Sequence, residues 1–254
     1  QQMLSIIDPN TDLRDRLPSI ATSMAPIGQL LPSVAGELGL PSGIPVAPGG
    51  GDNMMGAIGT GNVKPGLITM SLGTSGTIYS FADAPVIDPK GNIAAFCSST
   101  GGWLPLVCTM NCTIGTQLMA DLFDTNISQF EANLQNSARG AQGVIAVPFF
   151  NGERVPNLPG GKACLFGLDE QNMREEYFLR ATVEGVTFGF RVGLELLAKQ
   201  GMTAQDIVLT GGGANSPAWR QIVADICNAP VTVLTNPEAA ALGAALQALA
   251  SLTG

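Results

Sequence analysis

Histidine is absent from the 254 residues of this sequence, and its absence excludes several chemistries. Hydrolytic mechanisms of the Ser-His-Asp and Cys-His types both depend on an imidazole base. Zinc sites lose one of their usual ligands, and the five cysteines include no Cys-x-x-Cys pair that would compensate. Acid–base chemistry in this chain must therefore rely mainly on carboxylates.

Charge is also scarce. Only 13% of the residues are charged, the formal net charge is −8, and lysine and arginine do not cluster along the chain. Nucleic acids and anionic membranes bind concentrated positive charge, so neither is an expected partner. The acidic composition does not exclude a nucleotide, because main-chain N–H groups bind phosphate without formal charge.

Long apolar runs are missing as well. The run at 144–150 is far too short to span a bilayer, and we recognise no signal peptide. The odd number of cysteines in a chain of this length favours a reduced, cytoplasmic protein over a disulfide framework.

The chain begins with Gln1-Gln2-Met3 and not with an initiator methionine, and residues 8–26 have the pattern of a connecting loop. This beginning predicts a fragment of a longer protein; N-terminal processing or a tag scar is the alternative. We expect residues 1–43 to be a lead-in or linker from a missing N-terminal domain and residues 44–254 to form the C-terminal domain.

The order of the expected elements indicates an α/β fold. Hairpins come first and alternating strands and helices follow, which predicts a mixed sheet covered by helices on both faces. The expected strands are 44–47, 67–72, 77–81, 93–98, 104–109, 144–149, 207–210 and 231–234, and the strands at 144–149 and 207–210 should be buried. The expected helices are 33–38, 54–60, 111–122, 128–138, 174–199, 216–228 and 238–250.

Three glycine-rich loops follow expected strands, where ligands bind in α/β sheets. The first is Gly73-Thr74-Ser75-Gly76, a tight turn whose N–H groups and two hydroxyls can hold phosphate oxygens without lysine. Its alternative is a plain hairpin in which glycine only supplies a positive φ.

The second loop is Gly211-Gly212-Gly213-Ala214-Asn215. Three glycines let a flat ring or a ribose approach the main chain, and Asn215 can hydrogen-bond a base or sugar. The alternative is a strand-to-helix turn with Asn215 or Ser216 as N-cap.

The third loop is Gly49-Gly50-Gly51-Asp52-Asn53. Its glycines leave space beside the Asp52 carboxylate, and phosphoryl transfer to a sugar hydroxyl needs one such group to accept the proton. The alternative makes Asp52 the N-cap of a helix beginning near Met54, which is compatible with the catalytic role. A Walker A motif is absent, and Gly-x-x-Gly-x-Gly at 56–61 has the wrong order for a dinucleotide-binding fingerprint.

The combination of motifs resembles the FGGY carbohydrate kinases, members of the actin-like ATPase (ribonuclease H-like) superfamily. The motifs stand in one order at 49–53, 71–76, 151–156, 211–214 and 241–245, and the resemblance runs from about 27 to 250. Gly-Gly-Gly-Asp-Asn looks more like the xylulokinases than the glycerol kinases, which usually have Gln after the Asp. Ser98, where relatives commonly have His, and Tyr177 depart from the family pattern and bear on the identity of the sugar.

The resemblance implies ATP-dependent phosphorylation of a ketopentose, D-xylulose above all, with ATP and Mg²⁺ as cofactors and no metal ligand on the protein. It implies Asp52 as general base, Asp52 and Asn53 as sugar contacts, and the ATP contacts Gly73, Thr74, Ser75, Gly211, Gly212, Gly213 and Asn215. Arg154 is expected to brace its loop or to pair with Glu153. The N-terminal domain of the same enzyme is the expected partner, and this half alone is expected to be inactive.

Other functions stay open at this point. A gluconokinase, a glycerol kinase or another polyol kinase has the same motifs, and a non-catalytic actin-like nucleotide-binding module or a nicotinamide-dependent oxidoreductase would also use glycine loops. The oligomeric state, for which a homodimer is one option, does not follow from the sequence.

Overall fold

A computed structural model describes residues 2–253, which divide into two compact units. One unit comprises the chain up to residue 49 together with the residues from 248 onward, and the other comprises 50–247. We describe each unit by itself.

The first unit contains short elements. They are α1 (Gln2–Ile7), a 3₁₀ turn (Arg14–Arg16), β1 (Gly28–Gln29), α2 (Pro32–Leu38) and β2 (Pro45–Val46). The strands β1 and β2 pair antiparallel, so the predicted strand at 44–47 is confirmed but has two residues. Helix α2 begins at a proline and ends at Gly39, whose φ of 66° is left-handed, as predicted for a glycine C-cap.

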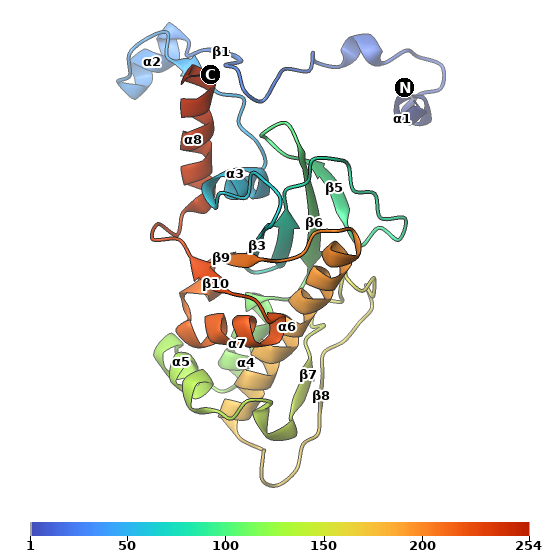
Figure 1. The fold of residues 1–254 in the computed structure, drawn as a ribbon, viewed down its shortest axis with the longest axis vertical. Helices are drawn as coiled ribbons and strands as arrows, with labels where there is room; N and C mark the ends of the chain where they lie inside the picture. The colour runs from blue at the N-terminus through green and yellow to red at the C-terminus, as the bar shows by residue number, and fades with distance from the viewer. Residues whose placement is uncertain (1, 254) are drawn as a thin grey trace. The chain divides into compact units, whose positions relative to one another are not determined.

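The second unit is built on a six-stranded mixed sheet in the order β10-β9-β3-β4-β6-β5 (Figure 1). Its strands are β3 (Leu67–Leu72), β4 (Gly76–Ser80), β5 (Ala94–Cys97), β6 (Trp103–Thr109), β9 (Asp206–Thr210) and β10 (Val231–Val233). The strands β10, β9 and β3 are parallel, and β3, β4, β6 and β5 are antiparallel neighbours. Both predicted hairpins are therefore present.

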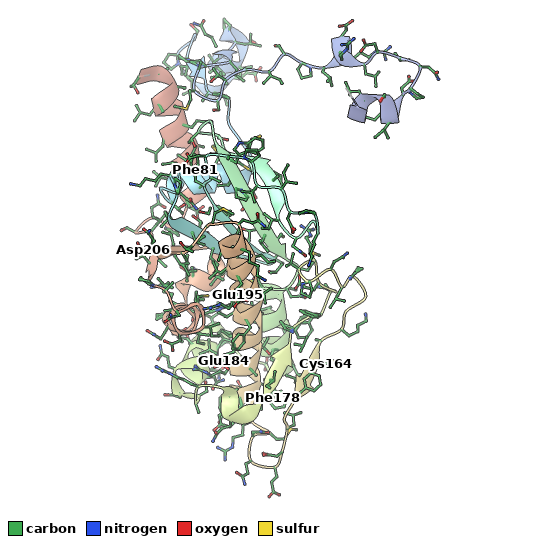
Figure 2. All side chains as sticks on the ribbon, turned by 45° about the vertical axis from the view of Figure 1, so that its right-hand side comes forward. Phe81, Cys164, Phe178, Glu184, Glu195 and Asp206 are labelled. Atoms are coloured by element: carbon green, nitrogen blue, oxygen red, sulfur yellow. The ribbon has the colours of Figure 1, made fainter. Side chains whose placement is uncertain are left out.

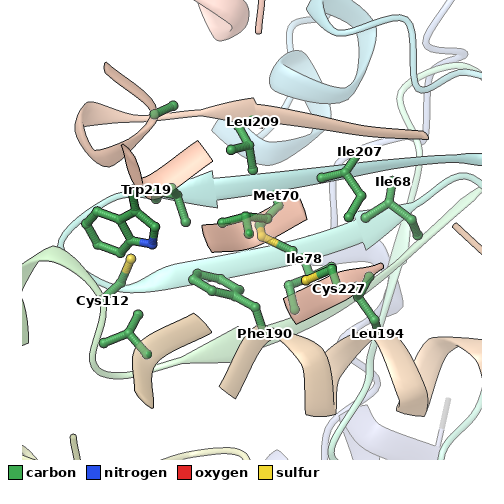
Figure 3. Packing of buried hydrophobic residues seen from close by; sticks show 14 of the residues in the cluster. Ile68, Met70, Ile78, Cys112, Phe190, Leu194, Ile207, Leu209, Trp219 and Cys227 are labelled. Carbon is green, nitrogen blue, oxygen red and sulfur yellow. The ribbon is translucent and has the colours of Figure 1, made fainter. Parts of the chain in front are cut away.

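Helices cover both faces of this sheet, as predicted. Because side chains alternate across a strand, Met70 and Ile78 face the main core, where they meet Phe190 and Leu194 of α6 (Glu175–Lys199) (Figure 3). Tyr79, Leu104 and Leu106 belong to a second cluster on the opposite face, packed with Ala57 of α3 (Asp52–Gly59). We call this second side of the sheet the α3 face.

The other elements complete the unit. The helices are α4 (Thr113–Leu122), α5 (Ile127–Asn136), α7 (Pro217–Cys227) and the part of α8 (Ala239–Thr253) up to residue 247, and 3₁₀ turns lie at Ala141–Gly143 and Gly212–Asn215. A separate two-stranded sheet pairs β7 (Ile145–Val147) with β8 (Cys164–Phe166). The predicted burial at 144–149 is wrong for Ile145, which is 62% exposed because β7 is not part of the central sheet. None of the described helices is long and apolar enough to cross a membrane.

Helix α6 carries two ion pairs at one-turn spacing. Glu184 and Glu195, labelled along α6 in Figure 2, accept from Arg180 (2.7 Å) and Arg191 (3.1 Å) respectively. The first pair is buried, and Arg180 also donates to the carbonyl of Leu134 at 3.1 Å, which ties the end of α5 to α6. The second pair is exposed, so its contribution to stability is small.

Candidate functional site

Two of the three glycine loops lie against each other at the carboxyl ends of β3 and β9. Ser71 pairs with Thr210 in the parallel register, so Gly73 and Gly211 follow at the same edge of the sheet. Gly211 has a φ of 82°, and a Cβ there would lie 2.8 Å from the carbonyl carbon of Leu72. Only glycine fits this position, and the contact brings the predicted phosphate turn and the predicted adenosine loop together.

The carbonyls of Gly73 and Thr74 are bound by the start of α4. The amide and the hydroxyl of Thr113 donate to the Gly73 carbonyl at 3.0 and 2.9 Å, and the amide of Cys112 donates to the Thr74 carbonyl at 3.2 Å. The first N–H groups of a helix have no partner within the helix, and this contact satisfies them.

The donors of the same turn remain available. Thr74 and Ser75 are exposed, and within residues 2–253 neither their amides nor their hydroxyls have a hydrogen-bond partner. A turn with two of its carbonyls bound and with unpaired amides and hydroxyls is suited to an oxyanion such as a phosphate. The residues present therefore fit the triphosphate of a nucleotide.

Glycine in this turn does not supply a positive φ, because neither Gly73 nor Gly76 has one, so the alternative of a hairpin explained only by positive φ is wrong. Gly76 is required by packing. A Cβ there would collide with the ring of Phe190 and lie 2.7 Å from Oγ1 of Thr109.

Asp52 is the first residue of α3 and Gly51 is its N-cap, without a side-chain capping bond. The alternative of Asp52 as N-cap of a helix beginning near Met54 is therefore wrong, because the helix begins two residues earlier, at Asp52 itself. Oδ1 of Asp52 accepts from the amide of Asn53 at 2.8 Å and from its Nδ2 at 3.3 Å. Oδ2 has no partner in the described part of the chain, and the side chain is exposed.

Asn53 connects this carboxylate to the β3–β4 hairpin. Oγ1 of Thr77 donates to Oδ1 of Asn53 at 3.0 Å, and Thr77 is only two residues beyond Ser75. Tyr79, on the same face of β4, lies close enough to feel the charge of Asp52: burial raises the pKa of the Tyr79 phenol, and the Asp52 carboxylate raises it further. Asp52 thus stands on the α3 face beside the strand that leaves the phosphate turn.

The 211–215 loop divides into open and packed positions. Gly212 has open space where a Cβ would stand, and Asn215 is exposed. Gly213 is buried, and a Cβ there would lie 2.9 Å from Cβ of Leu72, so its lack of a side chain is required by packing. Of the two capping candidates the structure selects Ser216, whose hydroxyl accepts from the amide of Trp219 at 3.0 Å.

The loop at 151–156 is held by a buried carboxylate. Glu153 is 5% exposed, and its Oε1 accepts from the amides of Met110 and Arg154, both at 2.7 Å. Its Oε2 accepts from Nδ2 of Asn111 at 3.2 Å. The predicted ion pair between Arg154 and Glu153 is wrong for the described residues, because main-chain and amide donors occupy the carboxylate.

Thr77 and Tyr79 were not singled out from the sequence, and Glu153 was named only as a partner of Arg154. Thr77 is bonded to Asn53 in the first turn of α3, and Tyr79 packs with Ala57 of the same helix. These contacts depend on strand register, for which the sequence carries no signal. Glu153 belongs to the motif at 151–156, where a carboxylate among Asn, Gly and Pro is a weak signal of a residue that anchors the loop. The described residues contain no group of three or more Cys, Asp or Glu that could hold a metal ion.

Comparison with known families gives two matches along the chain. Residues 68–252 match the C-terminal domain of the FGGY family of carbohydrate kinases, and residues 1–59 match the N-terminal domain of the same family. Asp52 and Asn53 therefore fall at the end of the N-terminal match, and both glycine loops at 73–76 and 211–215 fall within the C-terminal match.

Individual relatives are similar along nearly all of the chain. Xylulose kinase of Haemophilus influenzae is 44% identical over 249 residues, which cover 98% of this chain and 50% of the relative. The crystal structure of xylulose kinase from Bifidobacterium adolescentis superposes with a TM-score of 0.79 at 35% identity, covering 94% of this chain and 47% of the other. Gluconate kinase from Lactobacillus acidophilus gives a TM-score of 0.89 at 25% identity, covering 99% and 51%. The fold is that of the FGGY kinases, the actin-like ATPase fold, and the chain spans about half the length of these relatives.

Proposed function

This chain belongs to the FGGY family of carbohydrate kinases, and from that premise we propose that it is the ATP-binding half of an enzyme that phosphorylates D-xylulose to D-xylulose 5-phosphate. The observation that carries the proposal is the unpaired Oδ2 of Asp52, on a helix that is bonded through Asn53 to the hairpin whose turn has the free donors of Thr74 and Ser75. The similarity to the Haemophilus influenzae enzyme supports xylulose as the sugar.

In the proposed mechanism Asp52 accepts the proton of the sugar hydroxyl as that oxygen attacks. The hydrogen bonds from Asn53 and the link from Asn53 to Thr77 hold the carboxylate in place. The amides and hydroxyls of Thr74 and Ser75 bind the phosphate oxygens. When bound, ATP supplies the phosphoryl group and Mg²⁺ neutralises its charge.

Adenosine would lie against the 211–215 loop. Gly211 and Gly212 leave the main chain bare, Gly213 contributes through the packing that fixes the loop, and Asn215 is free to hydrogen-bond the base or ribose. Mg²⁺ keeps most of its ligands from phosphate and water, so it needs no protein cage.

The rest of the enzyme is the proposed partner. The N-terminal domain would close over ATP and sugar and exclude water, so the 254-residue chain alone should bind ATP weakly and show no turnover. A cytoplasmic enzyme fits this chemistry, because ATP is supplied there.

The test is a substrate panel on the full-length enzyme. We expect ADP release that depends on D-xylulose, with gluconate and glycerol far poorer as acceptors. Gluconate is the second candidate acceptor, and the similarity to the gluconate kinase structure supports it. If gluconate is the best acceptor, it replaces xylulose in the proposal. Stabilisation of this chain by ATP but not by NAD would separate a kinase from an oxidoreductase.

A further inference from the structure

Arg154 lies where the 151–156 loop reaches the end of β6. Oε1 of Glu153 accepts from the amides of both Met110 and Arg154, so the Arg154 main chain stands next to the residue that follows β6. The next residue, Val155, is 4% exposed and packs into the main core on the α6 side of the sheet. Arg154 itself is exposed and is the position at which this anchored loop presents a cation.

The Arg154 side chain reaches Cys108, which packs against the cluster on the α3 face. It interacts with the thiol of Cys108, where burial raises the pKa and the guanidinium opposes that increase. Cys108 pairs with Thr77 across β6 and β4, and paired side chains share a face with Cβ atoms about 5 Å apart. Thr77 in turn is bonded to Asn53, so Cys108 lies between the guanidinium and the residues that support Asp52.

The strand order places the residue that Arg154 contacts, Cys108 of β6, on the opposite side of β4 from β3 and β9. Gly211 follows β9 and Gly73 follows β3, whereas Thr77 is on β4 and Cys108 is on β6. Neighbouring strands are about 4.8 Å apart, so β6 is two strands from β3 and three from β9. The Cys108–Arg154 contact is therefore on the β6 side of the β3–β4 hairpin, away from the 211–215 loop that follows β9.

The guanidinium is also available for a ligand. Among the described residues Arg154 has no ion pair, and the nearest acid in sequence, Glu153, is occupied by three other donors. Arginine presents five N–H donors in a rigid fork and cannot lose its charge. Cys108 is a weak acceptor for such donors.

We propose that Arg154 is a specificity-determining residue that donates hydrogen bonds to oxygen atoms of the acceptor sugar, at the end away from the hydroxyl that Asp52 deprotonates. This inference rests on the proposed function and assigns the acceptor side of its site. Glu153 is the positioning residue, because its buried carboxylate fixes the Arg154 main chain against β6.

The test compares Arg154→Met and Arg154→Lys with wild type in the full-length kinase, and uses as a control Arg139→Met, which removes an exposed arginine that pairs with Asp225 of α7. Hydrogen bonds to a charged group predict that Arg154→Met raises the KM for the sugar about 10- to 100-fold while the KM for ATP changes less than about twofold. Arg154→Lys should fall between, because it keeps the charge and loses the fork. Arg139→Met should leave both constants unchanged.

An unchanged KM for the sugar, or an equal rise in the KM for ATP, would overturn the inference. If Arg154 only braced the loop, its replacement would lower the thermal midpoint of unfolding and would not change the KM for the sugar more than the KM for ATP. The wild-type enzyme is measured before any variant. If it forms no ADP with any sugar, the proposed function itself fails.

Discussion

The hydroxyl of Thr77 donates to Oδ1 of Asn53 at 3.0 Å, and this bond joins the β3–β4 hairpin to the first turn of α3. Asn53 in turn donates twice to Oδ1 of Asp52. The position of the carboxylate is therefore set by the same strand that leaves the phosphate turn. A shift of β4 would therefore be transmitted to the Asp52 carboxylate.

Thr77→Val should weaken catalysis through this link. The substitution preserves the shape of the side chain and removes the hydroxyl that donates to Oδ1 of Asn53, so this oxygen loses its hydrogen bond from β4. A net hydrogen bond is worth about 1 kcal/mol, so we expect kcat/KM for the sugar to fall about fivefold in the full-length kinase, measured by steady-state kinetics. Thr77→Ser keeps the hydroxyl and should retain activity. Equal losses in both variants would argue against the hydrogen bond as the cause.

Gly76→Ala should destabilise the hairpin. A Cβ there would collide with Phe190 and lie 2.7 Å from Oγ1 of Thr109, both held in the packed interior. Overpacking of this kind costs about 1–3 kcal/mol, measurable by urea unfolding of the 254-residue chain.

Gly189→Ala is the matched control for that substitution. Gly189 is in α6, and a Cβ there would meet nothing within 4 Å. Alanine is favoured over glycine in a helix by about 1 kcal/mol, so this variant should be as stable as wild type or more stable. Equal destabilisation by the two substitutions would contradict the packing that we describe around Gly76.

Cys227 should make stability depend on pH in the alkaline range. Burial raises the pKa of its thiol to about 11, and the charge of Arg191 opposes this increase. In the unfolded chain the thiol ionises near 8.5, so above that pH the unfolded state releases a proton that the folded state keeps. The free energy of unfolding should therefore fall as pH rises from about 8.5 to 11.

Denaturant unfolding of wild type and Cys227→Ala at pH 8, 9, 10 and 11 measures this contribution. The wild-type curve should be steeper by up to about 1.4 kcal/mol per pH unit, so its advantage over the variant shrinks as pH rises. Parallel pH dependence of the two proteins would mean that the thiol is not shielded from water in the folded state.

Regular elements with a strong local signal were predictable. The long helix at 174–199 has apolar residues at helical spacing and is observed as α6 at Glu175–Lys199. The Gly-Thr-Ser-Gly turn predicted the β3–β4 hairpin, and Gly39 predicted the end of α2. The strand β8 was missed because three residues, Cys164–Phe166, carry too little periodicity.

The candidate site was predictable as a set of loops but not as a set of contacts. Glycine runs after strands identified 49–53, 73–76 and 211–215, since bare main chain is a local property. The Asn53–Thr77 bond and the Glu153 anchor join residues that are 24 and 43 positions apart, and such contacts depend on tertiary packing. The start of α3 was also misplaced, because Gly51 and Asp52 are both acceptable N-caps and the sequence does not choose between them.

In the proposed mechanism Asp52 is the general base that accepts the proton of the sugar hydroxyl. Asp52→Asn in the full-length kinase keeps the size of the side chain and removes the base, and ADP release at saturating ATP and sugar measures the result. We predict that kcat falls by about 10²- to 10⁴-fold while the affinity for ATP stays within about twofold of wild type. A variant that retains near-normal kcat would contradict the account.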